Sequence, residues 1–482
     1  VARNSPLDKA QKISRIRGHA IYLKREDTQP VHSFKLRGAY NKIAKLTPEE
    51  KNAGVISASA GNHAQGVALA AKKLGISALI VMPRTTPSIK VDAVKSYGAT
   101  IELHGDNYSE AAEYCKQRMQ ETGRTYIHPF NDPLVIAGQG TIGREIIDQL
   151  PSVTHIFVPV GGGGLIAGIA SYVKTFRPDV VIVSVEPEDS NALQASILRK
   201  KRLTLSHVGI FADGVAVKQI GDITYPIARK TVDDFITVTT DQICAAIKTI
   251  FEDTRSIVEP AGALAVAGIA RYQLPETAVA VAICSGANMT FERLQQVSER
   301  TLTGSDREGI FAITLPERPG ALRALCTNVV RAHSINEFSY RMNDPKSAQI
   351  LIGIMVNDAS DKQVLADSLK KHCYTYSDLS QDETTKEHIR HMVGGHVPTT
   401  MREHFYEVIF PERPRALVDF LATIGSQWNI SLFHYRSSAS DSGRVLIGLQ
   451  ADDVHALEAK LSATGFEWRS IASHDKALSF VQ

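Results

Sequence analysis

The stretch IFVPVGGGGLIAGIASYVKTF, Ile156 to Phe176, decides how the first part of this chain folds. An apolar run leads into four consecutive glycines, Gly161 to Gly164, and an apolar segment that reads as a helix follows. A buried strand, a glycine loop and a helix in this order are typical of a parallel α/β sheet. Glycines at the start of a helix let backbone N–H groups surround a phosphate, although a tight turn without a ligand would use the same residues.

Similar apolar runs recur through the first 300 residues, beginning at Gly54, Ala78, Val180 and Ala278. Several are nearly continuous Val, Ile and Ala, and they end in Gly, Pro, Ser or Asn. Strands read this way when both faces of a parallel sheet are buried by helices. Because such sheets bind ligands at the carboxyl ends of their strands, we predict an α/β domain over residues 1–304 with its site at those ends.

The rest of the chain contains an internal repeat with an offset of 95 residues. Three short matches share this offset: PERP at 316–319 and 411–414, Tyr-Arg at 340–341 and 435–436, and LIG at 351–353 and 446–448. Each unit reads as a strand, a helix and two more strands, which is the size of a small α+β domain. We predict such domains over residues 305–380 and 403–482, joined by a charge-rich linker at 381–402.

The composition of the chain limits which kinds of partner and which cellular compartment we expect. The chain has 482 residues, and 54 Lys and Arg nearly balance 51 Asp and Glu, so no bulk charge favours nucleic acid. No apolar run approaches the roughly 20 residues that span a bilayer, so we expect no membrane partner. Five scattered cysteines indicate a reducing compartment, and we expect the cytoplasm. The chain begins at Val1 without a Met, so an organellar targeting peptide remains an alternative.

Three further stretches carry polar groups suited to chemistry. In VHSFKLRGAY, from Val31, a single lysine, Lys35, stands among apolar residues and is either an exposed helix lysine or a buried reactive amine. In SASAGNHAQG, from Ser57, backbone N–H groups and Ser59 suit a carboxylate, and Asn62 offers a donor and an acceptor. In CSGAN, from Cys284, Ser285 is either a partner for a ring nitrogen or part of a strand-end turn.

Together these groups describe a pyridoxal-phosphate site that acts on an amino acid, since such a site needs a phosphate cradle, a carboxylate loop, a ring-nitrogen partner and a lysine. A dinucleotide site is the alternative. Its strict glycine spacing is absent, and only the relaxed form at Gly162, Gly164 and Ala167 fits, with Glu186 as the ribose-binding acid. These residues alone therefore leave hydride transfer with a dinucleotide cofactor as an alternative function.

Eight motifs carry a family resemblance over essentially the whole chain. They are HSFKLRG from His32, SASAGNHAQG from Ser57, PVGGGGL from Pro159, FADGVAV from Phe211, VEPAGA from Val258, CSGAN from Cys284, MVGG from Met392 and NISLFHYR from Asn429. With them the chain resembles the fold-type II (tryptophan synthase β-like) pyridoxal-phosphate enzymes and, among these, the biosynthetic threonine dehydratases. The resemblance implies a catalytic domain of two α/β subdomains and two α+β ACT-like regulatory domains.

The resemblance also implies roles for single residues. Lys35 is implied as the catalytic lysine that forms the Schiff base with the cofactor, Asn62 as the partner of its phenolic oxygen, and Ser285 as the partner of its pyridine nitrogen. Further cofactor-binding residues are Phe34, Gly161, Gly162, Gly163, Gly164, Leu165 and Gly214; substrate-binding residues are Ser59, Ala60, Gly61, Asn62 and His63. The strands that carry Tyr340 and Tyr435 are implied to face an effector site.

The implied reaction is the dehydration and deamination of L-threonine to 2-oxobutanoate and ammonia, the first step of isoleucine biosynthesis. The implied effectors are isoleucine as inhibitor and valine as antagonist, and the implied assembly is a homotetramer. An L-serine dehydratase and an amino-acid sensor with a retained dehydratase fold are the alternatives. Ala60 occupies the place of a serine that serine racemases use as a base, so we expect poor racemisation.

We expect no metal site. Some relatives bind a divalent cation through a Glu-Pro pair and an acid six residues on, but here Glu186-Pro187 is followed by Ala192 at that place. His388 and His391 have helical spacing, yet no third ligand accompanies them, and we interpret them as part of a solvated linker.

Overall fold

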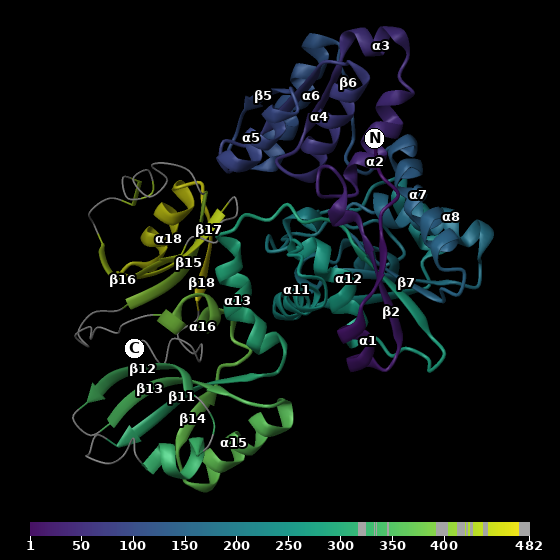
Figure 1. Cartoon of the computed structure of the whole chain (residues 1–482). Helices are drawn as coiled ribbons and strands as arrows, with labels where there is room; N and C mark the ends of the chain where they lie inside the picture. Colours follow the sequence, from purple (N-terminus) through teal and green to yellow (C-terminus); the bar gives the residue numbers. More distant parts are fainter. Residues whose placement is uncertain are drawn as a thin grey trace. The chain divides into compact units, whose positions relative to one another are not determined.

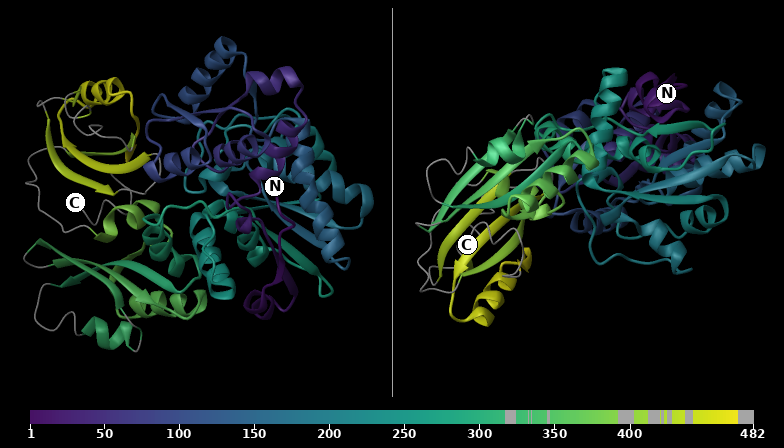
Figure 2. Two further views of the ribbon diagram at one scale, coloured as in Figure 1. Left: turned by 45° about the horizontal axis from the view of Figure 1, so that its top comes forward. Right: turned by 90° about the horizontal axis from the view of Figure 1, so that it is seen from below.

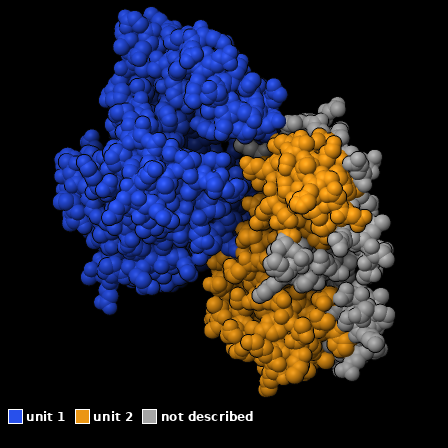
Figure 3. Space-filling view, turned by 180° about the vertical axis from the view of Figure 1, so that it is seen from behind, with its two compact units in different colours: residues 1–298 blue, residues 299–482 orange. Residues whose placement is uncertain are grey.

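The computed structural model describes residues 1–316, 324–331, 333, 335–344, 347–391, 403–411, 420, 423–424, 428–436 and 442–471. The chain divides into two compact units, residues 1–298 and 299–482, which Figure 3 colours separately. The domain boundary at residue 304 stays a prediction, since helix α13 (Arg293–Gly304) runs across this division. Within the ranges above, no helix has both the length and the apolar character needed to cross a membrane.

The first unit contains two sheets. In the larger sheet, of order β1-β2-β10-β7-β8-β9, only the β1–β2 pair is antiparallel, and the smaller sheet, β5-β4-β3-β6, is parallel throughout. The predicted α/β class is therefore confirmed. The strands are β1 (Leu7–Lys9), β2 (Ala20–Arg25), β3 (Val55–Ala58), β4 (Ala78–Met82), β5 (Thr100–Leu103), β6 (Thr125–Tyr126), β7 (His155–Pro159), β8 (Val181–Pro187), β9 (Asp234–Val238) and β10 (Val279–Cys284).

Helices cover both faces of these sheets (Figure 1). They are α1 (Gln11–Arg17), α2 (Lys35–Ala44), α3 (Pro48–Ala53), α4 (Asn62–Leu74), α5 (Ser88–Ser96), α6 (Tyr108–Thr122), α7 (Pro133–Gln149), α8 (Gly164–Phe176), α9 (Ala192–Leu198), α10 (Thr224–Thr231), α11 (Thr240–Thr254) and α12 (Pro260–Arg271). Short 3-10 turns are η1 (Glu26–Thr28), η2 (Glu188–Ser190) and η3 (Asp213–Val215). Figure 2 shows the same elements from two further directions.

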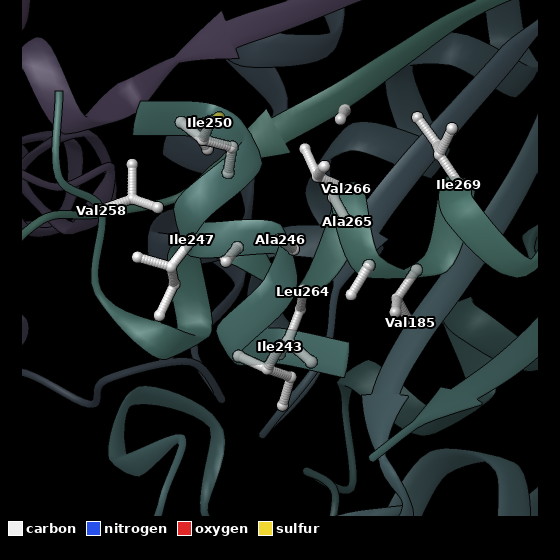
Figure 4. Close-up of a cluster of buried hydrophobic side chains, with 14 of the residues drawn as sticks. Val185, Ile243, Ala246, Ile247, Ile250, Val258, Leu264, Ala265, Val266 and Ile269 are labelled. Carbon is white, nitrogen blue, oxygen red and sulfur yellow. The ribbon is translucent and has the colours of Figure 1, made fainter. Parts of the chain in front are cut away.

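Successive side chains of the central strands enter different cores. Phe157 and Val183 pack with residues of α11 and α12, in the cluster that Figure 4 shows in part. Ile156 and Ile182, their neighbours in sequence, pack with residues of α7 and α8 on the other face. This is why the strands read as continuous apolar runs rather than as alternating ones.

The SASAGN loop follows β3, the glycine loop follows β7 and the CSGAN loop follows β10. All three therefore lie at the carboxyl ends of parallel strands. Helix α2, which begins with Lys35, packs on α4 and α7. In the larger sheet, β7 and β10 are neighbours, so the glycine loop and the CSGAN loop follow adjacent strands, as the predicted site requires.

The second unit contains two antiparallel four-stranded sheets of the same order, β12-β13-β11-β14 and β16-β17-β15-β18. Their strands begin 95 residues apart for β11 and β15 (403 minus 308) and for β13 and β17 (442 minus 347), which confirms the repeat. The elements are β11 (Glu308–Pro316), η4 (Cys326–Val330), β12 (Ile335–Asp344), β13 (Ser347–Met355), α15 (Ala359–Lys371), β14 (Thr375–Asp378), α16 (Glu383–Glu387), η5 (Ile389–His391), β15 (Glu403–Pro411), β16 (Asn429–Arg436), β17 (Ser442–Gln450), α18 (Val454–Ala463) and β18 (Glu467–Ile471).

One face of each sheet packs on its own helices, and the opposite faces share one core. Ile310 and Leu351 of the first sheet lie in that core with Phe405 and Leu446 of the second. These are equivalent positions, since each pair is 95 residues apart (405 minus 310, 446 minus 351). The two repeats therefore bury each other's apolar surface through matching side chains, as two identical domains would around a twofold axis.

The interpretation of His388 as part of a solvated linker is wrong. Residues 383–391 form α16 and η5, and His388 is only 1% exposed. The charges of this segment are paired within the unit: Arg300 contacts Glu383, Arg444 contacts Glu387 at 3.0 Å, and His388 lies 3.7 Å from Glu407. Charge-rich composition indicates solvent only where the charges lack partners. The remainder of the predicted linker, 392–402, lies outside the described residues.

Candidate active site

Lys35 lies at the first position of α2, and its amine is shielded from water. Its Nζ donates a hydrogen bond of 3.0 Å to the carbonyl oxygen of Pro129 and lies 5.2 Å from the centre of the Phe34 ring. Burial lowers the pKa of Lys35 to about 8, and the carboxyl of Glu259 opposes this only in part. A lysine with this pKa has a far larger neutral, nucleophilic fraction near neutral pH than an exposed lysine has. The structure thus favours the second interpretation of Lys35, a buried amine.

The glycine loop leaves a helix N-terminus open. Helix α8 begins at Gly164, after Gly163 in the left-handed region at φ +87°, and no side chain caps it. The first backbone N–H groups of α8 are therefore available for an anion. Thr224 Oγ1 donates to the carbonyl of Gly162 at 2.7 Å and holds the loop in place. A Cβ on Gly162 would lie 2.3 Å from the ring of Phe130, so the glycine loop packs directly on this ring. Phe130 follows Pro129, whose carbonyl accepts the hydrogen bond of Lys35, and the loop therefore lies close to that hydrogen bond.

Asn62 is held from both ends by the protein. Its Nδ2 donates to Glu259 Oε1 at 2.6 Å, and its Oδ1 accepts from Asn288 Nδ2 at 2.6 Å. The second oxygen of Glu259 accepts from the backbone N–H of Asn288 at 3.0 Å. Burial, and next to it Asp213, raises the pKa of Glu259 to about 7. Sequence reasoning gave Glu259 no role, although a single acid opening the small-residue helix PAGALAVAG was a visible signal.

Ser285 and Gly214 lie beside this group. Ser285 follows β10, is buried, and donates through Oγ to the carbonyl of Ala261 at 3.2 Å. Its own carbonyl accepts from the backbone N–H of Phe34, which places Ser285 next to the segment that carries Lys35. A Cβ on Gly214 would lie 3.5 Å from Glu259 Oε1, so this glycine borders the same carboxyl.

The loop between β3 and α4 contains the predicted substrate-binding residues. Ser59 Oγ accepts from the backbone N–H groups of Gly61 and Ala64, each at 3.3 Å, and Ala60 lies in the same turn. His63 points inward, because its Nε2 is 2.8 Å from the carbonyl of Ile127 and its side chain is buried. Burial, followed by the charge of Lys35, lowers the pKa of His63 to about 3, so the ring is neutral.

The structure brings most of the predicted residues together. Lys35, Phe34, Asn62, Gly214 and Ser285 are linked by the contacts above, and the glycine loop joins them through Phe130. Two side chains point away from this arrangement. The ring of His63 faces the carbonyl of Ile127, and the side chain of Leu165, in α8, is buried in the hydrophobic core, so only the backbone groups of these residues are suited to a ligand.

The two predicted effector positions occupy equivalent places in their sheets. Tyr340 lies in β12 opposite Ile350 of β13, and Tyr435 lies in β16 opposite Val445 of β17. The partners are again 95 residues apart (445 minus 350). The side chains of both tyrosines are outside the described part of the chain.

A group of potential metal ligands lies in the second unit: Glu387, His388 and Glu407. Both carboxylates already have cationic partners, Arg444 for Glu387 at 3.0 Å and Arg469 for Glu407 at 3.1 Å. Burial opposes the ionisation of Glu407, but its bonds to His388 and Arg469 lower its pKa to about 2. The arrangement is that of a buried ion-pair network, in which a metal ion would have to displace arginines.

The site fits a phosphorylated aldehyde. An uncapped helix N-terminus beside four glycines suits the phosphate, and a lysine amine of lowered pKa suits the aldehyde. Sequence comparison agrees. The family model described as pyridoxal-phosphate dependent enzyme matches residues 1–286, and the one described as C-terminal regulatory domain of threonine dehydratase matches residues 299–389 and 395–481.

Similar proteins include the biosynthetic L-threonine dehydratase IlvA of Burkholderia multivorans, 46% identical over 97% of this chain and 94% of that protein. Among solved structures, the processed form of threonine deaminase isoform 2 from Solanum lycopersicum is 47% identical, with a TM-score of 0.61 over 62% of this chain and 88% of that one. Maize serine racemase is 36% identical, with a TM-score of 0.59 over 62% of this chain and 93% of that one. The chain belongs to the family of pyridoxal-phosphate dependent enzymes and carries the C-terminal regulatory domain of threonine dehydratase.

Proposed function

We propose that this enzyme dehydrates and deaminates L-threonine to 2-oxobutanoate and ammonia, the first step of isoleucine biosynthesis. The observation that carries the proposal is the amine of Lys35, whose pKa is lowered by burial, beside the glycine loop, in a chain that matches biosynthetic threonine dehydratases over nearly its full length. Lys35, Phe34, Asn62, Gly161 to Leu165, Gly214 and Ser285 would hold pyridoxal 5'-phosphate.

The chemistry divides between cofactor and protein. Bound pyridoxal phosphate withdraws electrons from the carbon that carries the substrate's amino group, which makes the hydrogen on that carbon acidic. Lys35 Nζ is the base that takes this proton, since its lowered pKa leaves the amine able to accept one. Ser285 can share a hydrogen bond with a ring nitrogen but cannot keep a proton there as an aspartate would. This favours reactions that expel a leaving group at once, such as loss of the hydroxyl.

Substrate specificity rests on the loop at 59–63. Its backbone N–H groups and Ser59 suit the substrate carboxylate. The methyl group of threonine is worth about 1–3 kcal/mol in an apolar pocket, so L-serine should be the poorer substrate. Ala60 has no group to donate or accept a proton, so racemisation of serine should be negligible even though maize serine racemase is a structural relative.

The substrates of the purified holoenzyme test this proposal. We expect 2-oxobutanoate and ammonia from L-threonine, slower release of pyruvate from L-serine, and no measurable D-serine. Racemisation as fast as elimination would show that the argument from Ala60 is wrong. A folded, cofactor-loaded protein that binds amino acids without converting them would favour the alternative of an amino-acid sensor.

The second unit is proposed to regulate the first. Isoleucine as inhibitor and valine as antagonist are proposed as its effectors; the match to the threonine dehydratase regulatory domain and the duplication of that domain support a regulatory role. A homotetramer and a cytoplasmic location are proposed with them. A coupling of about 1–3 kcal/mol would change the apparent affinity for threonine roughly 5- to 150-fold, and threonine must weaken isoleucine binding by the same factor. An active chain truncated after Gly304 that isoleucine still inhibits fully would place the effector site elsewhere.

A further inference from the structure

The carboxyl of Glu259 stands at the centre of a contact between four segments of the chain. Glu259 precedes α12, and its side chain, only 3% exposed, reaches Asn62 at the start of α4 and Asn288 in the loop after β10. Asn288 in turn donates through Nδ2 to the carbonyl of Val31 at 2.8 Å, four residues before Lys35. Both oxygens of Glu259 and the Oδ1 of Asn62 thus have defined partners within the protein, as in a pre-organised site.

The local backbone is built to admit this carboxyl. A Cβ on Gly286 would lie 2.5 Å from Glu259 Oε1 and 3.2 Å from Asn62 Nδ2. A Cβ on Gly262 would lie 2.3 Å from the carbonyl oxygen of Gly286. Alanine at either position would push the loop and the carboxyl apart. The two glycines therefore make possible the short bond between Glu259 and Asn62.

The hydrogen-bonding capacity of Asn62 shows what the contact achieves. Its amide nitrogen carries two hydrogens, and the hydrogen bonds of the described residues use one of them, toward Glu259. Its oxygen is engaged by Asn288, which fixes the amide against rotation by 180°. One N–H of a fixed amide is then left for a ligand. We propose that Glu259 is a positioning residue, which orients the amide of Asn62 so that this N–H is presented to the oxygen of the cofactor ring.

Three charged groups face Glu259. Asp213 of η3 and Lys90 of α5 act on its carboxyl, and the carboxyl acts in turn on Lys35 of α2. Two N–H donors on one carboxylate favour the ionised form, whereas burial and Asp213 oppose it. The ionised carboxylate offers both oxygens as acceptors, one to Asn62 and one to Asn288, whereas a protonated carboxyl would carry an O–H hydrogen on one of them.

The test is cofactor affinity, measured by titrating the apoenzyme with pyridoxal 5'-phosphate in the absence of substrate. Glu259→Gln keeps the shape of the side chain but replaces one carboxylate oxygen by an NH₂ group. That group faces either Asn62 Nδ2 or the backbone N–H of Asn288 and cannot accept a hydrogen bond from it. We expect the dissociation constant to rise about 10- to 100-fold, the usual cost of a hydrogen bond to a charged group. Because no amino acid is present, this result is independent of whether threonine is the substrate.

A double-mutant cycle tests whether Glu259 affects cofactor binding through Asn62. Asn62→Ala should weaken cofactor binding by a similar factor, and adding Glu259→Gln to it should weaken binding no further. The two variants should also change the ratio of the absorption bands of the bound cofactor in the same way, since both alter the donor to its ring oxygen. Effects that multiply in the double variant would overturn the proposal.

Glu186→Gln is the matched control. Glu186 is 1% exposed and likewise accepts from two N–H groups, those of Leu193 and Gln194, each at 2.8 Å. Its variant should lower thermal stability and leave cofactor affinity and the absorption bands unchanged. If Glu259→Gln does not fold, Glu259→Asp retains the charge but is one methylene too short to reach Asn62, and it should show the same loss. Cofactor affinity within twofold of the wild type in a folded Glu259 variant would refute the proposal.

Discussion

Replacing Gly162 by alanine tests whether the glycine loop is shaped by its packing on Phe130. The new Cβ would lie 2.3 Å from the ring, whereas ordinary contact begins at 3.4 Å, so one of the two must move by about 1.1 Å (3.4 minus 2.3). The ring cannot move freely, because it packs edge-on against His128 at 4.7 Å between centroids. Forced overpacking of this kind costs about 1–3 kcal/mol of unfolding free energy.

The movement should also reach the cofactor site. Pro129, the residue before Phe130, accepts the hydrogen bond of Lys35, and Gly163 and Gly164 follow Gly162 directly. Losing the alignment of a single N–H group with a phosphate would weaken cofactor binding about 10- to 100-fold. Titration of the apoenzyme with pyridoxal 5'-phosphate, followed by visible absorption, measures this.

Gly75→Ala is the control for loss of stability alone. Gly75 ends α4 at φ +69°, and a Cβ there would meet nothing within 4 Å, so alanine costs about 1 kcal/mol of backbone strain without a steric clash. Both variants should unfold at lower temperature, but only Gly162→Ala should lose cofactor affinity. Wild-type affinity in Gly162→Ala would show that the loop does not depend on this packing.

Three further outcomes are expected. With a Lys35 pKa near 8, association of the cofactor with the apoenzyme should speed up with rising pH and level off above about 8; a rate still climbing toward pH 10 would indicate an ordinary lysine. Glu407 has a lowered pKa of about 2, so its stabilising effect should be present above the ordinary carboxyl pKa and disappear as pH falls toward 2; acid unfolding of Glu407→Gln should lack this component. Leu446→Ala, in the core shared by the two repeats, should cost about 2–5 kcal/mol in denaturant unfolding; a smaller loss would mean that the repeats are loosely packed.

The class of the fold and the place of the site could be read from the sequence because each rests on a local pattern. The run from Ile156 to Gly164 holds a buried strand and its loop within nine residues, and β7 and α8 appear where that pattern puts them. The repeat was visible because both copies keep the same spacing between β11 and β13 and between β15 and β17. Which strands pair with which could not be read, since β10 lies between β2 and β7 although it comes far later in the chain.

Glu259 and His388 show what the sequence conceals. The partners of Glu259, Asn62 and Asn288, are 197 and 29 residues away, and no local pattern links them. His388 lies in a segment rich in charge, which reads as solvated until its partners Glu407 and the neighbouring arginines are placed around it. In both cases the missing information is long-range contact.

Lys35 is the residue on which the proposed chemistry depends, and its replacement by alanine in the full-length enzyme is the most direct test. The wild type should form 2-oxobutanoate from L-threonine and keep its visible cofactor band through dialysis. Lys35→Ala should lose that band on dialysis and lose nearly all turnover while its thermal unfolding shows a folded chain. Turnover comparable to the wild type in the dialysed Lys35→Ala protein would contradict the account.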